Sequence, residues 1–255
     1  MNSNETPADS WTKTIVDLPL GPGPLRSLTL ARQEPAGTNS LALEQDSFKL
    51  RLANSEGRRE SADLLIKKMY AWRGYDTSGV LNDTPNRITL MADLKGQIVG
   101  TLTIGLDSST GLLVDQLYKD EIDGLRQAQR LVCELTKLAV NQDVHSQRVL
   151  AALFHLAYIY AHKIHAATDF VIEVNPRHAV FYKRMLGFSQ LGEERLCPRV
   201  NAPAILLRLT CEYITENTAK YGGAMHELPH VRNLYPFAFS QSDEVGITQR
   251  LLRGE

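Results

Sequence analysis

Residues 131–188 decide the fold, and they read LVCELTKLAV NQDVHSQRVL AALFHLAYIY AHKIHAATDF VIEVNPRHAV FYKRMLGF. Apolar runs bounded by turn residues predict two strands and two helices in alternation. These are a strand at 131–140, a helix at 150–164, a strand at 169–174 and a helix at 177–185 that stops at Gly187. The alternation predicts a crevice beside the strand ends, where open α/β sheets commonly bind ligands.

The flanking residues predict further strands and one more helix. Runs of β-favouring residues, with period-two alternation at the first, predict strands at 48–53, 87–94, 97–106 and 200–209. Apolar residues three and four apart predict a helix at 61–73. Lys95-Gly96 makes a short hairpin connection, and the polar segment 115–129 is compatible with a helix. Residues 1–44, rich in Pro, Gly and Ser, predict an extended or partly disordered arm.

The composition excludes several classes of protein. A chain of 255 residues with 43% hydrophobic and 22% charged residues can bury one sizeable core. Its net charge of -1 argues against nucleic-acid binding, which needs clustered Lys and Arg. Cys133, Cys197 and Cys211 are odd in number and lack CxxC spacing, which argues against disulfides and zinc. No run approaches the roughly 18 apolar residues of a membrane span, so we expect a soluble, cytoplasmic protein.

The order of a hairpin, a strand, a long helix, a further strand and a short helix ending in Gly187-Phe188 resembles the GNAT acyltransferase fold. The resemblance implies an α/β (α+β) domain at 45–211 with a mixed central sheet flanked by helices. It also implies that the strands at 131–140 and 169–174 splay apart to admit the pantetheine arm of an acyl donor. Residues 212–255 are then a C-terminal extension that packs on this domain.

The start of the long helix bears on the acyl donor. GNAT acetyltransferases carry Q/R-x-x-G-x-G/A here, whose glycines let backbone amides approach the diphosphate of coenzyme A. This chain has Gln147-Arg148-Val149-Leu150-Ala151-Ala152, and we expect Leu150 to obstruct that approach. The expected donor is therefore the phosphopantetheine thioester of an acyl carrier protein, with acyl-coenzyme A as the alternative. We expect no permanently bound cofactor and no metal.

Five stretches are similar to the long-chain N-acyl amino acid synthases, relatives of the acyl-homoserine lactone synthases. They are WRGY at 72–75, CELTKLAV at 133–140, VNPRH at 174–178, FYKRMLGF at 181–188 and NLYPFAFS at 233–240. The resemblance covers roughly residues 45–252 and implies aminolysis of a long-chain acyl thioester by a free amino acid. Lys137 departs from the arginine expected there, and the two cations differ in bidentate geometry.

The reaction assigns roles to particular residues. An α-amino group has a pKa of about 8 and must lose a proton before it attacks. Glu134, a carboxylate in an apolar strand, is the candidate base, Tyr182 the candidate acid for the leaving thiolate, and His178 a further catalytic candidate. Backbone N–H groups near Leu138 to Val140 are candidate oxyanion donors.

Binding residues follow from the same resemblance. The candidates for substrate binding are Lys137, Leu138, Val140, Asn175, Arg177, Trp72, Arg73 and Tyr75. An acidic carrier protein requires a basic surface, for which Arg148, Lys183 and Arg184 are the candidates.

Structural explanations compete with several of these roles. Glu134 and Lys137 can form a simple ion pair, and Asn175 with Pro176 can merely start a helix. Four histidines, at 145, 155, 162 and 165, are expected to be exposed or satisfied by neighbours, although His155 and His162 share a helical face. Leu112, Leu113, Leu117 and Leu125 can line an acyl tunnel or pack in the core. Alternative functions are an acyl-homoserine lactone synthase, a conventional acetyl-coenzyme A transferase and a non-catalytic carrier-binding module.

Overall fold

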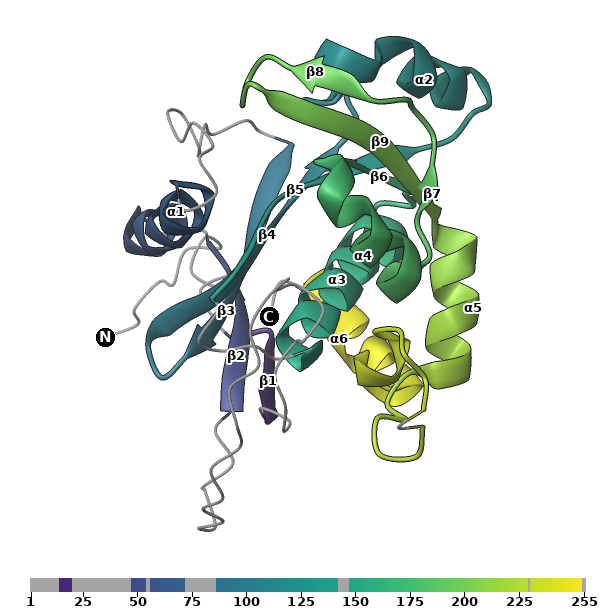
Figure 1. The fold of residues 1–255 in the computed structure, drawn as a ribbon. Coiled ribbons are helices and arrows are strands. Elements are labelled where there is room, and N and C mark those ends of the chain that lie inside the picture. The colour runs from purple at the N-terminus through teal and green to yellow at the C-terminus, as the bar shows by residue number, and fades with distance from the viewer. Residues whose placement is uncertain are drawn as a thin grey trace, which may run out of the picture.

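A computed structural model describes residues 14–19, 47–53, 56–71, 86–141, 147–228 and 230–253. Within these residues nine strands form the central sheet (Figure 1). The strands are β1 (Val16–Pro19), β2 (Ser47–Leu52), β3 (Arg87–Leu94), β4 (Gln97–Leu106), β5 (Val132–Val140), β6 (Asp169–Val174), β7 (Ser189–Gln190), β8 (Arg195–Cys197) and β9 (Ala202–Thr210). Their order is β1-β2-β3-β4-β5-β6-β9-β7, with β8 paired to β9. This is the mixed sheet that the sequence predicts, with three short strands that it does not predict, β1, β7 and β8.

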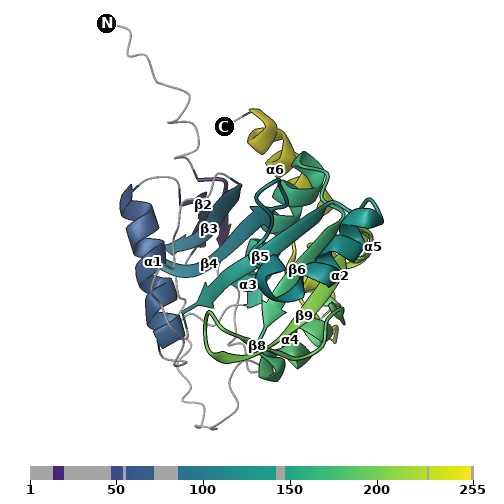
Figure 2. The ribbon, with the colours of Figure 1, turned by 90° about the horizontal axis from the view of Figure 1, so that it is seen from above.

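Helices cover both faces of the sheet (Figure 2). They are α1 (Glu56–Ala71), α2 (Asp115–Gln127), α3 (Gln147–Tyr158) with its π-helical continuation η3 (Ile159–Ile164), α4 (Pro176–Leu186), α5 (Cys211–Tyr221), the 3-10 turn η4 (Tyr235–Phe237) and α6 (Gln241–Arg253). Ala139 of β5 packs with α1 and Val132 with α2, whereas Leu135 belongs to the core beneath α3. Side chains therefore alternate between an α1/α2 face and an α3 face of the sheet.

The main core lies between the sheet and α3. Helix α3 is apolar on most of its circumference, so almost all of its residues are buried. Its close approach to β4 depends on Gly100, where a Cβ would lie 3.0 Å from both Val149 Cγ1 and Leu153 Cδ1. A side chain at position 100 therefore forces the Val149 and Leu153 side chains to give by a few tenths of an ångström.

Helix α4 has the start and stop signals read from the sequence. The Asn175 side chain accepts a hydrogen bond from the Arg177 amide, Pro176 occupies the first turn, and Gly187 ends the helix with φ of 88°. The capping role assigned to Asn175 and Pro176 is therefore present, and it fixes the direction in which α4 leaves the end of β6.

The C-terminal extension, for which the sequence predicted no helices, forms η4, α6 and all but the first residue of α5. These helices bury only a few side chains each, such as Ile247 and Leu251 of α6. Their apolar stripes are too sparse to register as periodic. Glu244 of α6 is joined to His155 of α3 at 2.9 Å and to Lys163 of η3 at 3.1 Å, which ties the segment to the main core. None of the described helices combines the length and apolar character that spanning a membrane requires.

Candidate active site

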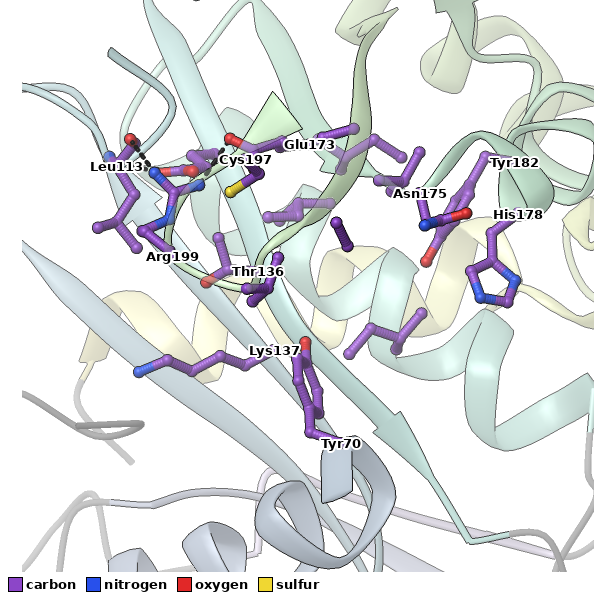
Figure 3. A pocket seen from close by; sticks show the side chains of 18 of the residues that line it. Tyr70, Leu113, Thr136, Lys137, Glu173, Asn175, His178, Tyr182, Cys197 and Arg199 are labelled. Carbon is purple, nitrogen blue, oxygen red and sulfur yellow. Dashed lines mark hydrogen bonds and ion pairs between the residues drawn. The ribbon is translucent and has the colours of Figure 1, made fainter. Parts of the chain in front are cut away.

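Strands β5 and β6 pair in parallel over only three residues, Val132 to Glu134 opposite Asp169 to Val171. Beyond Glu134 the strands separate, and a cavity of about 230 Å³ occupies the opening (Figure 3). The predicted splay between these strands is confirmed. It arises because β5 stays with β4 up to Val140 while β6 pairs along its whole length with β9 on its other side.

The cavity connects the two faces of the sheet. Its wall includes the successive residues Glu134 and Leu135, whose side chains point to opposite faces. It also includes Tyr70 from α1 and Phe154 from α3, two helices that cover opposite faces. Two substrates can therefore approach one point from opposite sides.

Glu134 is a buried carboxylate in this wall, with a side chain only 1% exposed. Its Oε2 accepts a hydrogen bond of 2.8 Å from the Leu113 amide and lies 3.7 Å from Arg87 Nη2. Burial raises the pKa of Glu134 to about 7, although the Arg87 charge and the Leu113 amide oppose the shift. Arg87, and not Lys137, is the cation at ion-pair distance among the described residues, so the simple Glu134–Lys137 pair is absent there. Glu134 is thus suited to exchange a proton near neutral pH.

Lys137 marks an irregularity in β5. Its φ of 53° is unusual for a residue other than glycine, and the β4–β5 register shifts between Thr101 and Thr103. Thr101 Oγ1 donates a 3.0 Å hydrogen bond to the Lys137 carbonyl, which holds the bulge in place. Burial, with the nearby Arg87 charge, lowers the pKa of Lys137, whose side chain lines the cavity.

The edge of β5 beyond Glu134 faces the opening and has no strand partner there in the described part of the sheet. Leu138, on this edge, lines the cavity, whereas Val140 lies outside its wall. Backbone N–H groups along such an unpaired edge are available to an oxygen atom in the cavity.

Helix α4 supplies His178 and Tyr182, which lie one turn apart and both line the cavity next to Asn175 (Figure 3). Arg177 is exposed and lies outside the wall; its Nε donates a 3.2 Å hydrogen bond to His178 Nε2. The Tyr182 ring packs edge-on against Phe188, which limits its rotation. Two polar residues of the segment 174–178, Asn175 and His178, therefore line the cavity.

The basic candidates for carrier binding lie on two helices. Lys183 and Arg184 are exposed at the end of α4, and Lys183 Nζ donates to Gln190 at 3.1 Å. Arg148, in the first turn of α3, is partly buried; burial lowers its pKa while Asp243 of α6 opposes the shift. Trp72, Arg73 and Tyr75 lie outside the described residues.

Leu150 corrects one sequence expectation. Its side chain is fully buried in the main core, so its bulk fills the interior beneath α3. The expectation that the Leu150 side chain obstructs a diphosphate is therefore wrong.

The other candidates are mostly structural. Leu112 and Leu125 pack in a cluster around α2, and of the four leucines only Leu113 lines the cavity. His155 accepts from the Phe239 amide and donates to Glu244, and His162 bonds to the Ala167 carbonyl, so both are satisfied by neighbours. No metal-binding group of His, Cys, Asp or Glu occurs among the described residues.

Two charged residues of the wall, Glu173 and Arg199, were not among the predicted site residues. Glu173 interrupts apolar β6 as Glu134 interrupts β5, so the same signal marks it in the sequence. Arg199, between β8 and β9, carries no sequence signal. Its Nη2 donates to Glu173 at 2.6 Å, and its Nη1 donates to the Leu113 carbonyl at 3.1 Å (Figure 3).

The family described as N-acyl amino acid synthase FeeM matches residues 61–210 of this chain. No curated protein matches the chain. A similar solved structure is that of FeeM, an N-acyl amino acid synthase from uncultured soil microbes, with 26% identity over 66% of this chain and 93% of that chain and a TM-score of 0.60.

More distant structures have GNAT-type folds. An acyl-CoA N-acyltransferase from Pseudomonas aeruginosa is 15% identical over 63% of this chain and 97% of that chain, with a TM-score of 0.45. The acyl-homoserine lactone (AHL) synthase LasI is 11% identical over 64% of this chain and 89% of that chain, with a TM-score of 0.44.

Proposed function

This chain belongs to the FeeM family of N-acyl amino acid synthases and is an N-acyltransferase, and we propose that it transfers a long-chain acyl group from acyl carrier protein to the amine of a free amino acid. One observation carries the proposal within this chain. A buried carboxylate with a pKa of about 7, Glu134, lies where β5 and β6 part, in a cavity that reaches both faces of the sheet.

Glu134 acts as the base in this proposal. An α-amino group with a pKa of about 8 is mostly protonated at neutral pH, and Glu134 accepts that proton directly or through water. The amine nitrogen then attacks the thioester carbon, and the carbonyl oxygen becomes an oxyanion. Backbone N–H groups on the free edge of β5 near Leu138 stabilise that charge.

The tetrahedral intermediate collapses when the C–S bond breaks and the N–C amide bond remains. The pantetheine thiolate leaves and takes a proton from Tyr182, which lines the opening with His178. The second proton that the attacking nitrogen must lose passes through water to the Tyr182 phenolate, which restores the phenol. His178 and Asn175 hold polar groups of the pantetheine arm, and Lys137 contacts a substrate from β5. The family resemblance alone suggests the remaining proposed substrate contacts, which are Trp72, Arg73, Tyr75, Val140 and Arg177.

We propose that the acyl chain runs toward a second, smaller cavity. It has a volume of about 30 Å³, is almost wholly apolar and shares Leu135 and Phe154 with the first cavity. Its far wall comes from the C-terminal segment, through Ile214, Leu234 and Ala238. We place the acyl tail along this path, because burial of methylene groups there contributes about 0.8 kcal/mol each.

An acyl carrier protein is the proposed donor. A carrier presents its thioester on an arm with a single phosphodiester and docks through surface charge. Lys183 and Arg184 offer exposed positive charge to an acidic carrier. Arg148 is the third proposed carrier contact. Three free, buried cysteines fit a reducing cytoplasm, where such a carrier is found.

The test is to incubate the full chain with acylated carrier protein, or with acyl-coenzyme A, and a pool of amino acids, and to identify products by mass spectrometry. We expect N-acyl amino acids, formed faster from the carrier protein. Absence of any acyl amide with either donor contradicts the proposal, as does a lactone formed only with S-adenosylmethionine. Faster turnover of acyl-coenzyme A than of acylated carrier protein would contradict the proposed donor but not the proposed amide product.

A further inference from the structure

Two carboxylates of the cavity wall, those of Glu134 and Glu173, each pair with an arginine. Arg87 Nη2 is 3.7 Å from Glu134 Oε2, and Arg199 Nη2 is 2.6 Å from Glu173 Oε2. Glu134 is the proposed base for the amine. The proposed reaction leaves the second pair without a role.

Glu134 and Arg199 are linked through a single residue, Leu113. The Leu113 amide donates to Glu134 Oε2 at 2.8 Å, and the Leu113 carbonyl accepts from Arg199 Nη1 at 3.1 Å. The Glu134 carboxylate and the Arg199 guanidinium therefore flank the same residue, and both residues line the cavity. An α-amino acid bound between them presents its amine to Glu134 and its carboxylate to Arg199.

Arg199 retains donors for a carboxylate. Its guanidinium has five N–H groups. Nη1 donates to the Leu113 carbonyl and to Gln116 Oε1, and Nη2 donates once to Glu173. Within the described part of the chain, these hydrogen bonds leave the Nε–H and one Nη2–H without an acceptor. Arg199 therefore has donors left for a carboxylate.

The charge and position of Arg199 are well defined. Burial lowers its pKa, but the adjacent Glu173 carboxylate outweighs burial and the net shift is upward, so Arg199 is always cationic. Its side chain is 30% exposed and lines the cavity, while that of Glu173 is 10% exposed and fixes it from β6. Arg199 is therefore a held cation that a small anion can reach.

We propose that Arg199, positioned by Glu173, binds the α-carboxylate of the acceptor and so makes the enzyme select amino acids over amines that lack a carboxylate. The inference rests on the proposed function. With the carboxylate on Arg199, the acceptor amine lies beside Glu134, which removes its proton.

The experiment compares two acceptors with the same side chain, an amino acid and its decarboxylated amine, using acylated carrier protein as donor. Arg199→Gln is expected to lower kcat/KM for the amino acid roughly 10- to 100-fold, mainly through KM, and to leave the amine almost unchanged. Arg199→Lys keeps a charge without the bidentate edge and is expected to show a smaller loss, again confined to the amino acid. The double variant Arg199→Gln/Glu173→Gln removes any effect of leaving Glu173 unpaired.

Arg195→Gln is the matched control. Arg195 on β8 also pairs with a glutamate, Glu121, and donates to a backbone carbonyl, that of Leu117, but it does not line the cavity. We expect it to leave the preference for the amino acid unchanged. The role of Arg199 is overturned if kcat/KM falls equally for both acceptors in Arg199→Gln and in the double variant, or if it falls for neither acceptor. Amide synthesis by the unmodified protein still stands in both cases. If that protein makes no acyl amide, the proposed function fails and this inference fails with it.

Discussion

Glu134 is the last residue of β5 that pairs with β6, and it does so opposite Val171. Pairing up to this point buries the carboxylate, and separation beyond it opens a cavity at the same carboxylate. Burial raises its proton affinity and the opening makes it accessible to substrate, so one topological feature supplies both requirements of a general base.

Replacing Glu134 by glutamine is expected to slow acyl transfer by roughly 10²- to 10⁴-fold. The glutamine carbonyl can still accept the Leu113 amide, so the fold is retained. In the unmodified enzyme kcat/KM rises as pH increases through about 7, because the carboxylate loses its proton there. The variant loses this step, and its deficit shrinks at alkaline pH as free amine becomes abundant.

The measurement for Glu134 is kcat/KM against pH for both proteins. Glu121→Gln, which removes a carboxylate paired with Arg195 outside the cavity, is the control and should leave the profile unchanged. Coincident profiles for Glu134→Gln and the unmodified enzyme remove Glu134 from the mechanism.

The same residue makes stability depend on pH. Its pKa is about 7 in the folded chain against 4.5 as the ordinary value, so the folded state binds more protons between these limits. Its contribution to stability is fully present below about pH 4.5 and is lost as pH rises through 7. The loss amounts to roughly 3 kcal/mol, from 1.36 kcal/mol per pKa unit.

Denaturant unfolding of the unmodified chain and Glu134→Gln at pH 4.5 and pH 8.5 measures this loss. We expect the unfolding free energy of the glutamine variant, relative to that of the unmodified chain, to be higher at pH 8.5 than at pH 4.5 by that amount. An equal difference in unfolding free energy at both pH values contradicts the buried ionisation.

Tyr182→Phe tests the proposed acid. Removing one hydroxyl from the cavity wall is expected to lower kcat by roughly 10²-fold with little change in KM, because proton donation to the thiolate occurs only in the transition state. Tyr213→Phe, on exposed α5, is the matched control outside the wall. Unchanged kcat in Tyr182→Phe assigns this side chain to packing against Phe188.

Phe154 is expected to control acyl chain length, since it stands between the two cavities. Phe154→Ala joins them and should shift the optimum of kcat/KM toward longer acyl chains, whereas Ala238→Leu shortens the far end and should shift it the other way. A series of carrier proteins with acyl chains of increasing length gives the measurement. The same optimum in all three proteins places the tail elsewhere.

Reversing the charges of Lys183 and Arg184 to glutamate is expected to raise KM for acylated carrier protein roughly tenfold and to weaken its dependence on salt. Turnover of a free acyl-pantetheine should not change. The control reverses Arg250 and Arg253, which are exposed on α6. An equal rise in KM for both donors indicates damage to the site instead of loss of a carrier contact.

The sequence by itself determined the order of elements from 131 to 188, because long apolar runs and the Asn175 and Gly187 caps are local signals that tertiary packing did not override. A lone carboxylate in an apolar strand likewise singled out Glu134. Helices α5 and α6 were missed because each buries few side chains. Their stability comes from packing of α5 on β9 and of α6 on η3.

Only the tertiary structure decided which charged groups meet at the cavity. Arg87, Glu173 and Arg199 come from β3, β6 and the β8–β9 connection, and no spacing along the chain reports their approach to Glu134. Burial likewise had to be seen in three dimensions, since the side chain of Leu150 turned out to fill the core. Local patterns encode backbone conformation, whereas charge pairing and pKa depend on neighbours that the fold brings together from distant parts of the chain.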